Sequence, residues 1–422
     1  NKLVIVLIIV FACCWQLEAV TYNAKNGVLD LQHIDLHKHH SIALTGKWKI
    51  FWNVILSPEE LKKKTTISGK PISLPHFWIK RMIKHIPVKN KGAATYSLTI
   101  LFKKPYKNLY LKCPVINTSY TLYANGTLIH KAGKPALLKK NSHPGASVHL
   151  SKITLKSSKL ELLVQVSNHF QLLGGFFKPI EIGIENTLQS KELYKLIFYI
   201  FAAGILFIIA LYHGGIFFLR RDNWAALFFS LICLTVFIRL LNSMENIYFS
   251  PVNFISWQFY KKISFGSFYL LFPFSVMYVH SLFPNEFKKT VVRITQGLGC
   301  IAILLTVISK PLIFTLPLHI FQIFSFLLYV YVLYVSIIAT IRQRQGSSLF
   351  LSGLVIYFLI LIFYLINRKM IYGFGYLPIA GVLIFIIIQA FMLSKIFSDA
   401  FKTVEKLSTE LQTTNNELRD LN

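Results

Sequence analysis

The sequence predicts a multidomain membrane protein: an antiparallel β-sandwich, then a bundle of seven transmembrane helices and a C-terminal coiled-coil helix. Three observations support this fold class. The 422 residues are 54% hydrophobic and include 36 Phe, more apolar surface than a soluble chain of this length usually carries. Short alternating runs fill residues 25–185, and long apolar stretches fill residues 191–397. Heptad spacing then continues through residues 398–422.

Residues 1–20 have the pattern of a secretory signal peptide. One Lys precedes an apolar run and then small residues, and the run is shorter than the ~20 apolar residues that a spanning helix needs. Cys13 follows a sequence that loosely resembles a lipoprotein site. The bulky Phe11 favours an ordinary signal peptide over lipidation.

Residues 25–185 are predicted to form short β-strands in an antiparallel sandwich or barrel. Asn125-Gly126 lies between two alternating runs, which is the strongest short-range signal for a β-hairpin. Ser57 and Pro58 can open one short helix. The strand-like runs are "YSLTILF" (96–102), "NLYLKC" (108–113), "SYTLYANGTLIHKAG" (119–133) and "KLELLVQVS" (159–167).

Seven apolar stretches, each near the length of a membrane span, make up residues 191–397. Their approximate limits are Tyr194–Leu219, Trp224–Leu241, Ile263–Phe283, Val291–Ser309, Leu318–Thr340, Leu349–Ile366 and Leu377–Phe397.

The orientation follows mainly from the signal peptide. It places residues 25–185 outside the cell membrane and, after seven spans, Asn422 in the cytoplasm. The short loops that this orientation makes cytoplasmic carry slightly more Lys and Arg than the opposite loops. The net charge of +28 does not oppose it, because long domains translocate largely regardless of charge.

Residues 398–422 are predicted to form a cytoplasmic coiled-coil signalling helix. Gly and Pro are absent from Gln389 onward, so the last span can continue into this segment as one helix that transmits a movement. Because each chain would leave the membrane in the same direction, we expect a parallel homodimer. Its seam is Val404, Leu407, Leu411, Leu418 and Leu421.

Several stretches resemble the 7TMR-DISM family, bacterial seven-span receptors with diverse intracellular signalling modules. "FYIFAAGILFIIALYHGGIFFLRRDNWAALFFSLICLTVFIRLL" (198–241) resembles the opening of its membrane domain, and "YGFGYLPIAGVLIFIIIQAFMLSKIFSDAFKTVEKL" its last span and exit helix. "ISLPHFW", "GAATYSLTILF", "LYANGTLIHKAG" and "LVQVSNHFQLLGGFFKPIEIG" resemble its type 2 extracellular jelly-roll domain.

The resemblance implies a receptor in the cytoplasmic membrane of a bacterium. Its outer domain would be a jelly roll of galactose-binding-like type that senses a small, carbohydrate-like ligand. Its output would come from a kinase, nucleotide cyclase or phosphatase domain, and the present residues show no motif of such a domain.

Two groups of residues are candidates for ligand binding. In "SNHFQLLGG" (167–175), polar Asn168 and His169 end a strand, and Gly174 and Gly175 allow close backbone approach; a turn that fixes loop geometry is the alternative. Aromatic faces suit sugar rings, which makes Trp78 at a loop edge and Tyr96 further candidates. Trp48 and Trp52 share a strand face and are expected in the core.

The remaining signals favour neither metal nor catalytic chemistry. The histidines of "HIDLHKHH" (33–40) are better explained by a solvated loop than by a metal site, and Cys113, Cys233 and Cys300 form no ligand or disulfide pattern. Arg239, inside the second span, either faces the bundle interior or reaches outward. With no nucleophile motif or paired carboxylates, we expect no catalytic residue, cofactor or nucleic-acid partner. A transporter or membrane scaffold with a β-sandwich docking module is the alternative to a receptor.

Overall fold

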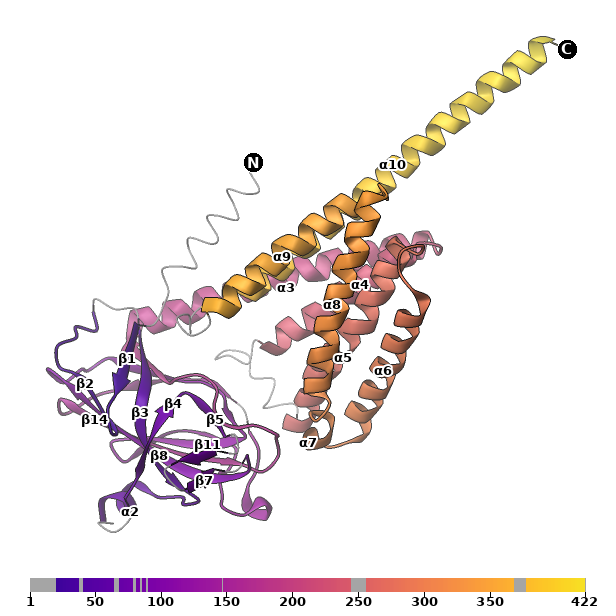
Figure 1. The fold of residues 1–422 in the computed structure, drawn as a ribbon. Helices are drawn as coiled ribbons and strands as arrows, with labels where there is room; N and C mark the ends of the chain where they lie inside the picture. Colours follow the sequence, from indigo (N-terminus) through magenta and orange to yellow (C-terminus); the bar gives the residue numbers. More distant parts are fainter. Residues whose placement is uncertain are drawn as a thin grey trace.

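The computed structural model describes residues 20–37, 41–63, 68–78, 81–83, 86–88, 90–145, 147–243, 256–367 and 377–421. The predicted signal peptide, apart from Val20, lies outside these residues. Figure 1 shows a β-domain at one end of a bundle of helices and one helix that extends far beyond the bundle at the other end. The fold class is therefore confirmed: a mainly antiparallel β-domain is followed by seven long apolar helices.

Most strands of the β-domain belong to one sheet of eleven, with the central order β12-β11-β14-β8-β3-β16-β9-β13. The strands are β1 (Val20–Ala24), β2 (Val28–Leu31), β3 (Ile42–Trp52), β4 (Lys70–Leu74), β5 (His76–Trp78), β6 (Arg81–Ile83), β7 (Ile86–Val88), β8 (Gly92–Phe102), β9 (Leu109–Cys113), β10 (Ile116–Asn117), β11 (Ser119–Ala124), β12 (Thr127–Ala132), β13 (His149–Ile153), β14 (Lys159–Asn168), β15 (Gly174–Phe176) and β16 (Glu181–Ile184).

The sheet folds over one core because β3 changes partners along its length. Its first half, from Ile42 to Gly46, pairs with β1 and in part with β16, whereas its second half pairs with β4 and β8. Gly46 lies at the change with φ 93°, and a Cβ there would stand 2.3 Å from the backbone N of Ala24. A strand that bends in this way can join the two layers of a sandwich.

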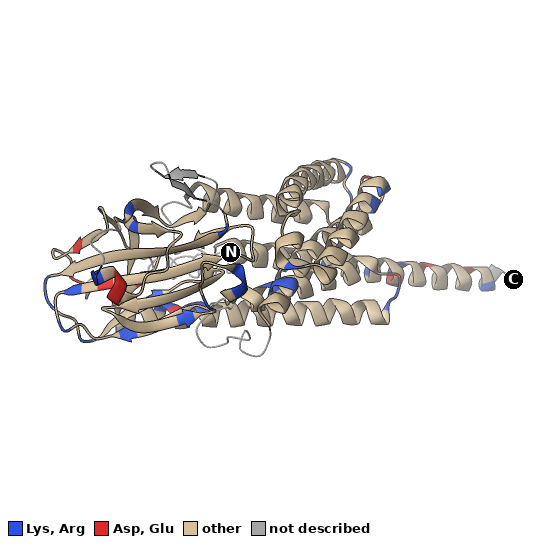
Figure 2. Cartoon of the chain, turned by 90° about the horizontal axis from the view of Figure 1, so that it is seen from below, with Lys and Arg blue, Asp and Glu red and all other residues tan. Residues whose placement is uncertain are grey.

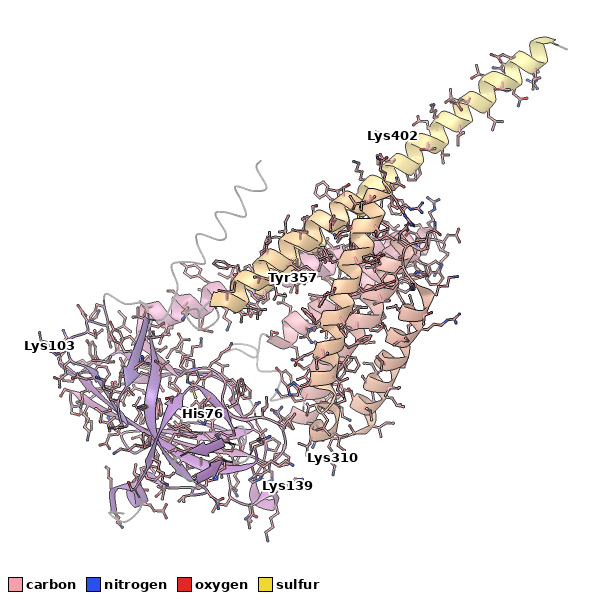
Figure 3. The ribbon with its side chains drawn as sticks, viewed as in Figure 1. His76, Lys103, Lys139, Lys310, Tyr357 and Lys402 are labelled. Atoms are coloured by element: carbon pink, nitrogen blue, oxygen red, sulfur yellow. The ribbon has the colours of Figure 1, made fainter. Side chains whose placement is uncertain are left out.

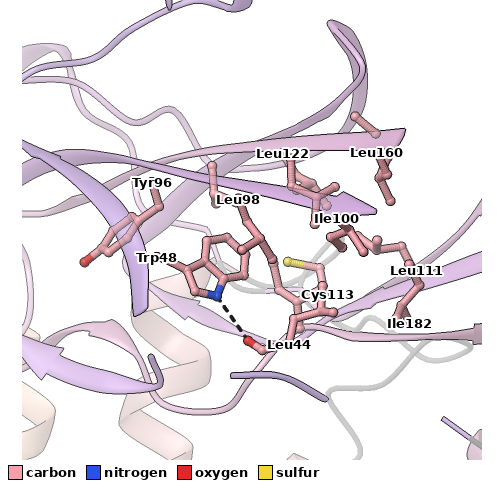
Figure 4. Packing of buried hydrophobic residues seen from close by; sticks show 14 of the residues in the cluster. Leu44, Trp48, Tyr96, Leu98, Ile100, Leu111, Cys113, Leu122, Leu160 and Ile182 are labelled. Atoms are coloured by element: carbon pink, nitrogen blue, oxygen red, sulfur yellow. Dashed lines mark hydrogen bonds between the residues drawn. The ribbon is translucent and has the colours of Figure 1, made fainter. Parts of the chain in front are cut away.

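The core contains side chains from strands β3, β8, β9, β11, β14 and β16 (Figure 4). Trp48, expected in the core, is fully buried, and its Nε1 donates to the carbonyl of Leu44 at 3.3 Å. Two pairings differ from a purely antiparallel sandwich, because β1 runs parallel to β3 and β2 runs parallel to β8. Alternation of side chains predicts a strand but not the direction of its neighbour.

Two local predictions in the β-domain are confirmed. Asn125 and Gly126 have φ of 49° and 86° and connect β11 to β12, as a tight hairpin with positive φ at both turn residues requires. Helix α2 (Pro58–Lys63) begins after Ser57, whose Oγ accepts from the Glu60 N–H at 3.2 Å while Glu60 accepts from the Ser57 N–H at 2.9 Å. This is a capping box.

The helical part contains seven helices, among the described residues, that are long and apolar enough to cross a membrane. Lys and Arg gather on the β-domain and at helix ends, whereas the helix middles are almost free of charge (Figure 2). The helices are α3 (Glu185–Leu219), α4 (Trp224–Ser243), α5 (Trp257–Leu282), α6 (Lys289–Ile308), the short α7 (Pro311–Phe314), α8 (Leu318–Ile341), α9 (Ser347–Asn367) and α10 (Leu377–Leu421).

Sequential helices are neighbours in the bundle, and α10 returns to touch α3. The span and the predicted signalling segment form one continuous helix, because α10 runs without a break from Leu377 to Leu421. Figure 3 places Lys310 at the end of the bundle beside the β-domain and Lys402 on α10 beyond the opposite end, which we call the far end.

Candidate functional site

The loop "SNHFQLLGG" is built around Asn168, which is fully buried. The Asn168 side-chain amide donates to the carbonyls of Asn90 and Gln171 at 2.8 and 3.1 Å, and its Oδ1 accepts from the Gln171 N–H at 3.1 Å. These bonds close the turn, so Asn168 has the geometric role that was the alternative to ligand contact. His169 is half-buried, with Nε2 2.9 Å from the carbonyl oxygen of Ala136.

The aromatic candidates beside this loop are packed in the core. Trp78 and Tyr96 are both 0% exposed, and the Trp78 Nε1 donates to the Tyr96 hydroxyl at 2.6 Å. The expected loop-edge position of Trp78 is wrong, because β5 pairs with β15 and carries the indole inward. A Cβ at Gly174 would lie 2.8 Å from the Trp78 ring, and one at Gly175 equally close. The two glycines therefore let the backbone approach Trp78.

The same loop contacts the helical bundle. The ring of Phe170 meets the indole of Trp257 edge to face, with 6.4 Å between centroids. Trp257 is the first residue of α5 and is 6% exposed. The loop that ends β14 therefore rests on the end of a membrane helix.

A second connection is covalent. Strand β16 ends at Ile184 and α3 begins at Glu185, earlier than the predicted limit of 191, so no linker separates the β-domain from the first span. The Thr187 hydroxyl donates to the Ile184 carbonyl at 2.9 Å within this turn. A shift of β16 must therefore move the start of α3.

A buried network of charged side chains, here called the junction network, surrounds this turn. Lys191 Nζ lies 2.6 Å from Glu181 Oε2, Lys112 forms ion pairs with Glu181 at 3.4 Å and with Glu192, and Ser41 Oγ donates to Glu181 at 3.2 Å. The side chain of Glu192 is 2% exposed. The sequence signal for this network was "KELYK" (191–195) at the start of a span, directly after a basic domain that contains Glu181, and sequence analysis missed it.

Electrostatics hold the network in its charged form. Burial by itself raises the pKa of Glu181, but the ammonium groups of Lys112 and Lys191 and the hydrogen bond from Ser41 outweigh it and hold that pKa well below its usual range. Burial lowers the pKa of Lys112, and the carboxylates of Glu181 and Glu192 more than reverse this. The network thus carries full charges between the two parts of the protein.

The β-domain and the bundle also line a partly open polar cavity of about 400 Å³, here called the junction cavity. Its lining combines polar residues of the β-domain, such as Asn117, with those at the near ends of α3, α4 and α5, such as Asn242 and Tyr260. Cations outnumber carboxylates in the lining. The ionic lining residues are Lys112, Lys178, Glu181, Lys195, Arg239 and Lys261.

At the far end of the bundle, the loop between α8 and α9 contacts α10 where that helix leaves its neighbours. Gly346 has φ 78°, and a Cβ there would lie 2.9 Å from Met392 and Ile396 of α10. Arg344 Nε donates to Glu286 at 2.7 Å and ties this loop to the loop between α5 and α6. The loop between α8 and α9 therefore packs on α10 at its exit from the bundle, and the bond from Arg344 to Glu286 holds that loop in place.

The predicted coiled-coil seam lies beyond this point and is uncovered in the single chain. Val404, Leu407, Leu411 and Leu418 are 64%, 55%, 67% and 56% exposed. The side chain of Leu421 lies outside the described residues. No partner chain is present, so the dimer stays a prediction.

A pair of histidines in the β-domain was not singled out by the sequence. His130 on β12 and His149 on β13 stack at 4.0 Å between ring centroids, 8° from parallel, and His130 Nε2 lies 2.8 Å from the Ser147 hydroxyl. Burial, with a contribution from His149, lowers the pKa of His130 to about 4, and burial also lowers that of His149.

Within the described residues, no three His, Cys, Asp or Glu side chains are grouped as metal ligands. In the segment "HIDLHKHH", Asp35 Oδ1 accepts from the His37 N–H at 3.0 Å, which is the bond of a local turn. His39 and His40 lie outside the described residues.

Comparison with known proteins adds a family match for the bundle. Residues 195–395 match the model of 7TM diverse intracellular signalling, 7TMR-DISM_7TM. No curated protein matches the chain.

Solved structures similar to the chain include bacterial glycosidases. The Faecalibacterium prausnitzii beta-glucuronidase is 11% identical over 34% of this chain and 31% of its own, with a TM-score of 0.26. Bacteroides uniformis beta-glucuronidase 3 is 15% identical over 34% and 22%, with a TM-score of 0.27. The Ruminococcus gnavus beta-glucuronidase is 16% identical over 34% and 28%, with a TM-score of 0.25. The chain thus spans less than a third of each of these enzymes.

Proposed function

We propose, from the premise that the membrane domain of this chain belongs to the 7TMR-DISM family, that the protein is a receptor whose β-domain responds to a ligand and whose α10 delivers the signal. The output domain would follow α10. The chain itself would carry the signal without catalysing a reaction.

The observation that carries this proposal is the rigid continuity at both ends of the bundle. Strand β16 becomes α3 without a linker, and α10 continues from the last span to Leu421 without a break. A helix can transmit a shift or a rotation along its axis. The packed interfaces between helices switch between discrete arrangements and do not deform continuously. A change at the β-domain can therefore reach the C-terminal segment through two helices that touch each other.

A row of buried side chains crosses the bundle between these two helices. His213 on α3 packs edge to face on Phe229 of α4 at 4.8 Å, and Phe229 stacks on Tyr278 of α5 at 5.4 Å. The Tyr278 hydroxyl donates to Gln389 Oε1 on α10 at 3.3 Å. Because His213 and Gln389 are both 0% exposed, this row supports coupled movement of α3 and α10.

The proposal places the β-domain outside the cytoplasmic membrane and the end of α10 in the cytoplasm. It rests on the signal-like residues 1–20 and on the odd number of spans found among the described residues. The ligand would be a small polar molecule, carbohydrate-like in chemistry. Of the six candidate ligand residues, His169 alone is incompletely buried, so the proposed direct contact of this loop with a ligand is made by His169.

The proposal also includes a parallel homodimer through the seam on α10. The seam has heptad spacing and exposed apolar side chains, and a second copy leaving the membrane in the same direction would cover them. Two heptads with Thr414 in the middle form a marginal coil, which suits a switch between states separated by a few kcal/mol.

The test changes a residue of the junction network and measures crosslinking between copies near the C-terminal end of α10. Single cysteines at Leu411 or Gln412, in a background without native cysteines, report seam geometry by crosslinking in membranes. We expect Glu181→Gln to change the ratio of crosslinking at the two positions, because the charge that holds β16 against α3 is lost. Lys159→Ala is the matched control, since Lys159 pairs with Glu161 at 2.6 Å on the exposed surface of the β-domain.

An unchanged ratio in a folded Glu181→Gln protein would overturn the proposal. It would leave α10 as a tether and favour a transporter or a membrane scaffold.

A further inference from the structure

The bundle contains a second cavity, of about 410 Å³, here called the bundle cavity. It lies between α3, α4, α5, α8, α9 and α10, and its lining is mainly aliphatic and aromatic, with Leu271, Leu354 and Ile379 among the contributing residues. None of the described residues in this lining carries a carboxylate. Its volume lies at the lower end of the range for small-molecule sites, roughly 300–1,000 Å³. An apolar cavity of this kind binds apolar groups in preference to water.

One cation lies at the end of the bundle cavity nearest the β-domain. Arg239 on α4 is half-buried, donates from Nη1 to the Ser264 carbonyl at 3.2 Å, and lies over the Phe268 ring at 5.3 Å. Within the described residues it forms no ion pair; Glu245 lies outside them. A guanidinium has five N–H donors, and among the described residues this one carbonyl accepts from it, so most of those donors are left for other partners. A charge inside a span is costly and marks a functional position by default.

The two cavities meet at this residue. Arg239 and Ser243 line both the bundle cavity and the junction cavity. On one side of Arg239 the lining is apolar, and on the other it is polar with an excess of cations, including Lys178 and Lys261. An apolar compartment thus opens beside a cationic one.

We propose that the two cavities together bind an amphiphile with an acidic head group and one apolar tail. The head group lies in the junction cavity and accepts hydrogen bonds from Arg239, and the tail occupies the bundle cavity. The anion satisfies a guanidinium held in a low-dielectric site, and the tail fills a volume that water fills poorly. The size of the bundle cavity favours a single chain, such as that of a fatty acid.

Such a ligand would touch both helices that carry the signal. Leu206 of α3 and Ile386 of α10 line the bundle cavity, and Lys195 of α3 lines the junction cavity. Occupancy would therefore set the spacing of α3 and α10. The binding itself does not depend on the proposed receptor function.

Photolabelling of the purified full chain in lipid nanodiscs tests the proposal. The probe is a 16-carbon fatty acid with a diazirine in its tail and an alkyne handle, and the control probe is the alcohol of the same chain. We expect the acid to label peptides of α5, α9 or α10 that line the bundle cavity, and unlabelled fatty acid to compete. Losing a charged hydrogen-bond partner should reduce labelling about tenfold in Arg239→Gln.

Two further variants complete the design. Arg293→Gln removes an exposed cation of α6 outside both cavities and should label as the unchanged protein does. Ile379→Trp fills the bundle cavity and leaves Arg239 unchanged, and it should also block labelling. The proposal can therefore be tested even if Arg239→Gln fails to fold.

Competition against the photolabel distinguishes a membrane lipid from a soluble amphiphile as the ligand. Displacement of the probe by single-chain lysophosphatidylglycerol, but not by lysophosphatidylcholine, supports the proposal with a membrane lipid as ligand. If free fatty acid alone displaces the probe, the result supports the proposal with a soluble amphiphile as the ligand. Equal labelling by acid and alcohol, or labelling confined to the lipid-facing surface of the bundle, overturns it.

Discussion

Phe170 and Trp257 meet edge to face, 6.4 Å apart, and this contact joins the last long strand of the β-domain to the first turn of α5. Phe170 belongs to the loop that ends β14, and the same loop is closed by the fully buried Asn168. The contact therefore places the loop directly against a helix of the bundle.

The first prediction concerns this pair. Phe170→Ala and Trp257→Ala should each lower the apparent melting temperature of the purified protein by roughly 2–4 °C or more. The double variant should lose less than the two together, because an edge-to-face pair contributes about 0.5–1.5 kcal/mol beyond its buried area. Phe77→Ala is the control, since Phe77 packs on Phe177 within the β-domain at 4.7 Å. Additive effects of Phe170→Ala and Trp257→Ala would show that the contact carries no coupling.

The second prediction concerns Glu181. Removing one partner of a buried ion pair leaves charges without compensation, so Glu181→Gln should destabilise the protein by about 3 kcal/mol. The folded-state pKa of Glu181 lies below the ordinary carboxyl value, so the ion pair contributes stability above that value and loses it as the pH falls toward the folded-state pKa. The melting temperature should therefore change less between pH 7 and pH 3 in Glu181→Gln than in the unchanged protein. An equal difference in both proteins would contradict this.

A third prediction follows from the stacked histidines. The folded-state pKa of His130 is about 4, below the ordinary value of 6.5, so the unfolded chain binds more protons in this interval. Stability should fall as the pH drops from 6.5 toward 4, and the variant His130→Gln with His149→Gln should lose part of this dependence. Melting temperatures at pH 7 and pH 5 measure it. The exposed His143→Gln is the control, and an undiminished pH dependence in the double variant would refute the assignment.

The fourth prediction concerns membrane orientation. A reporter active only in the cytoplasm should work when fused after Asn422 and fail when inserted at the Asn125-Gly126 turn, which is exposed and tolerates insertion. A reporter active only outside should give the reverse result. Activity of the outside reporter at Asn422 would invert the orientation.

The fifth prediction concerns the exit helix. Single cysteines at Leu411 and Leu418 should crosslink between copies, and one at Gln412 should crosslink poorly, because a parallel seam brings the same heptad positions together. Four residues inserted after Lys406 should rotate the seam and change the output of the full-length receptor. Uniform crosslinking at the three positions, or none in membranes, would exclude a parallel dimer.

The sequence by itself determined the elements that depend on local periodicity. Apolar stretches of membrane length predicted all seven spans, and the absence of Gly and Pro after Gln389 predicted that α10 continues past the membrane. Asn125-Gly126 predicted its hairpin, since only a turn with positive φ at both positions explains that dipeptide between two strands. These signals are carried by neighbouring residues, so one sequence suffices to read them.

Only the tertiary structure decided what the polar and aromatic residues do. Trp78 is buried because β5 pairs with β15, and the buried Asn168 donates to the carbonyl of Asn90; both contacts join segments distant in sequence. Arg239 was left between two roles, and the structure places it between two cavities. The junction network joins Lys112 of β9 with Glu192 of α3, a contact that side-chain periodicity does not encode. Long-range pairing depends on how the sheet folds over its core, and that is set by packing of the whole domain.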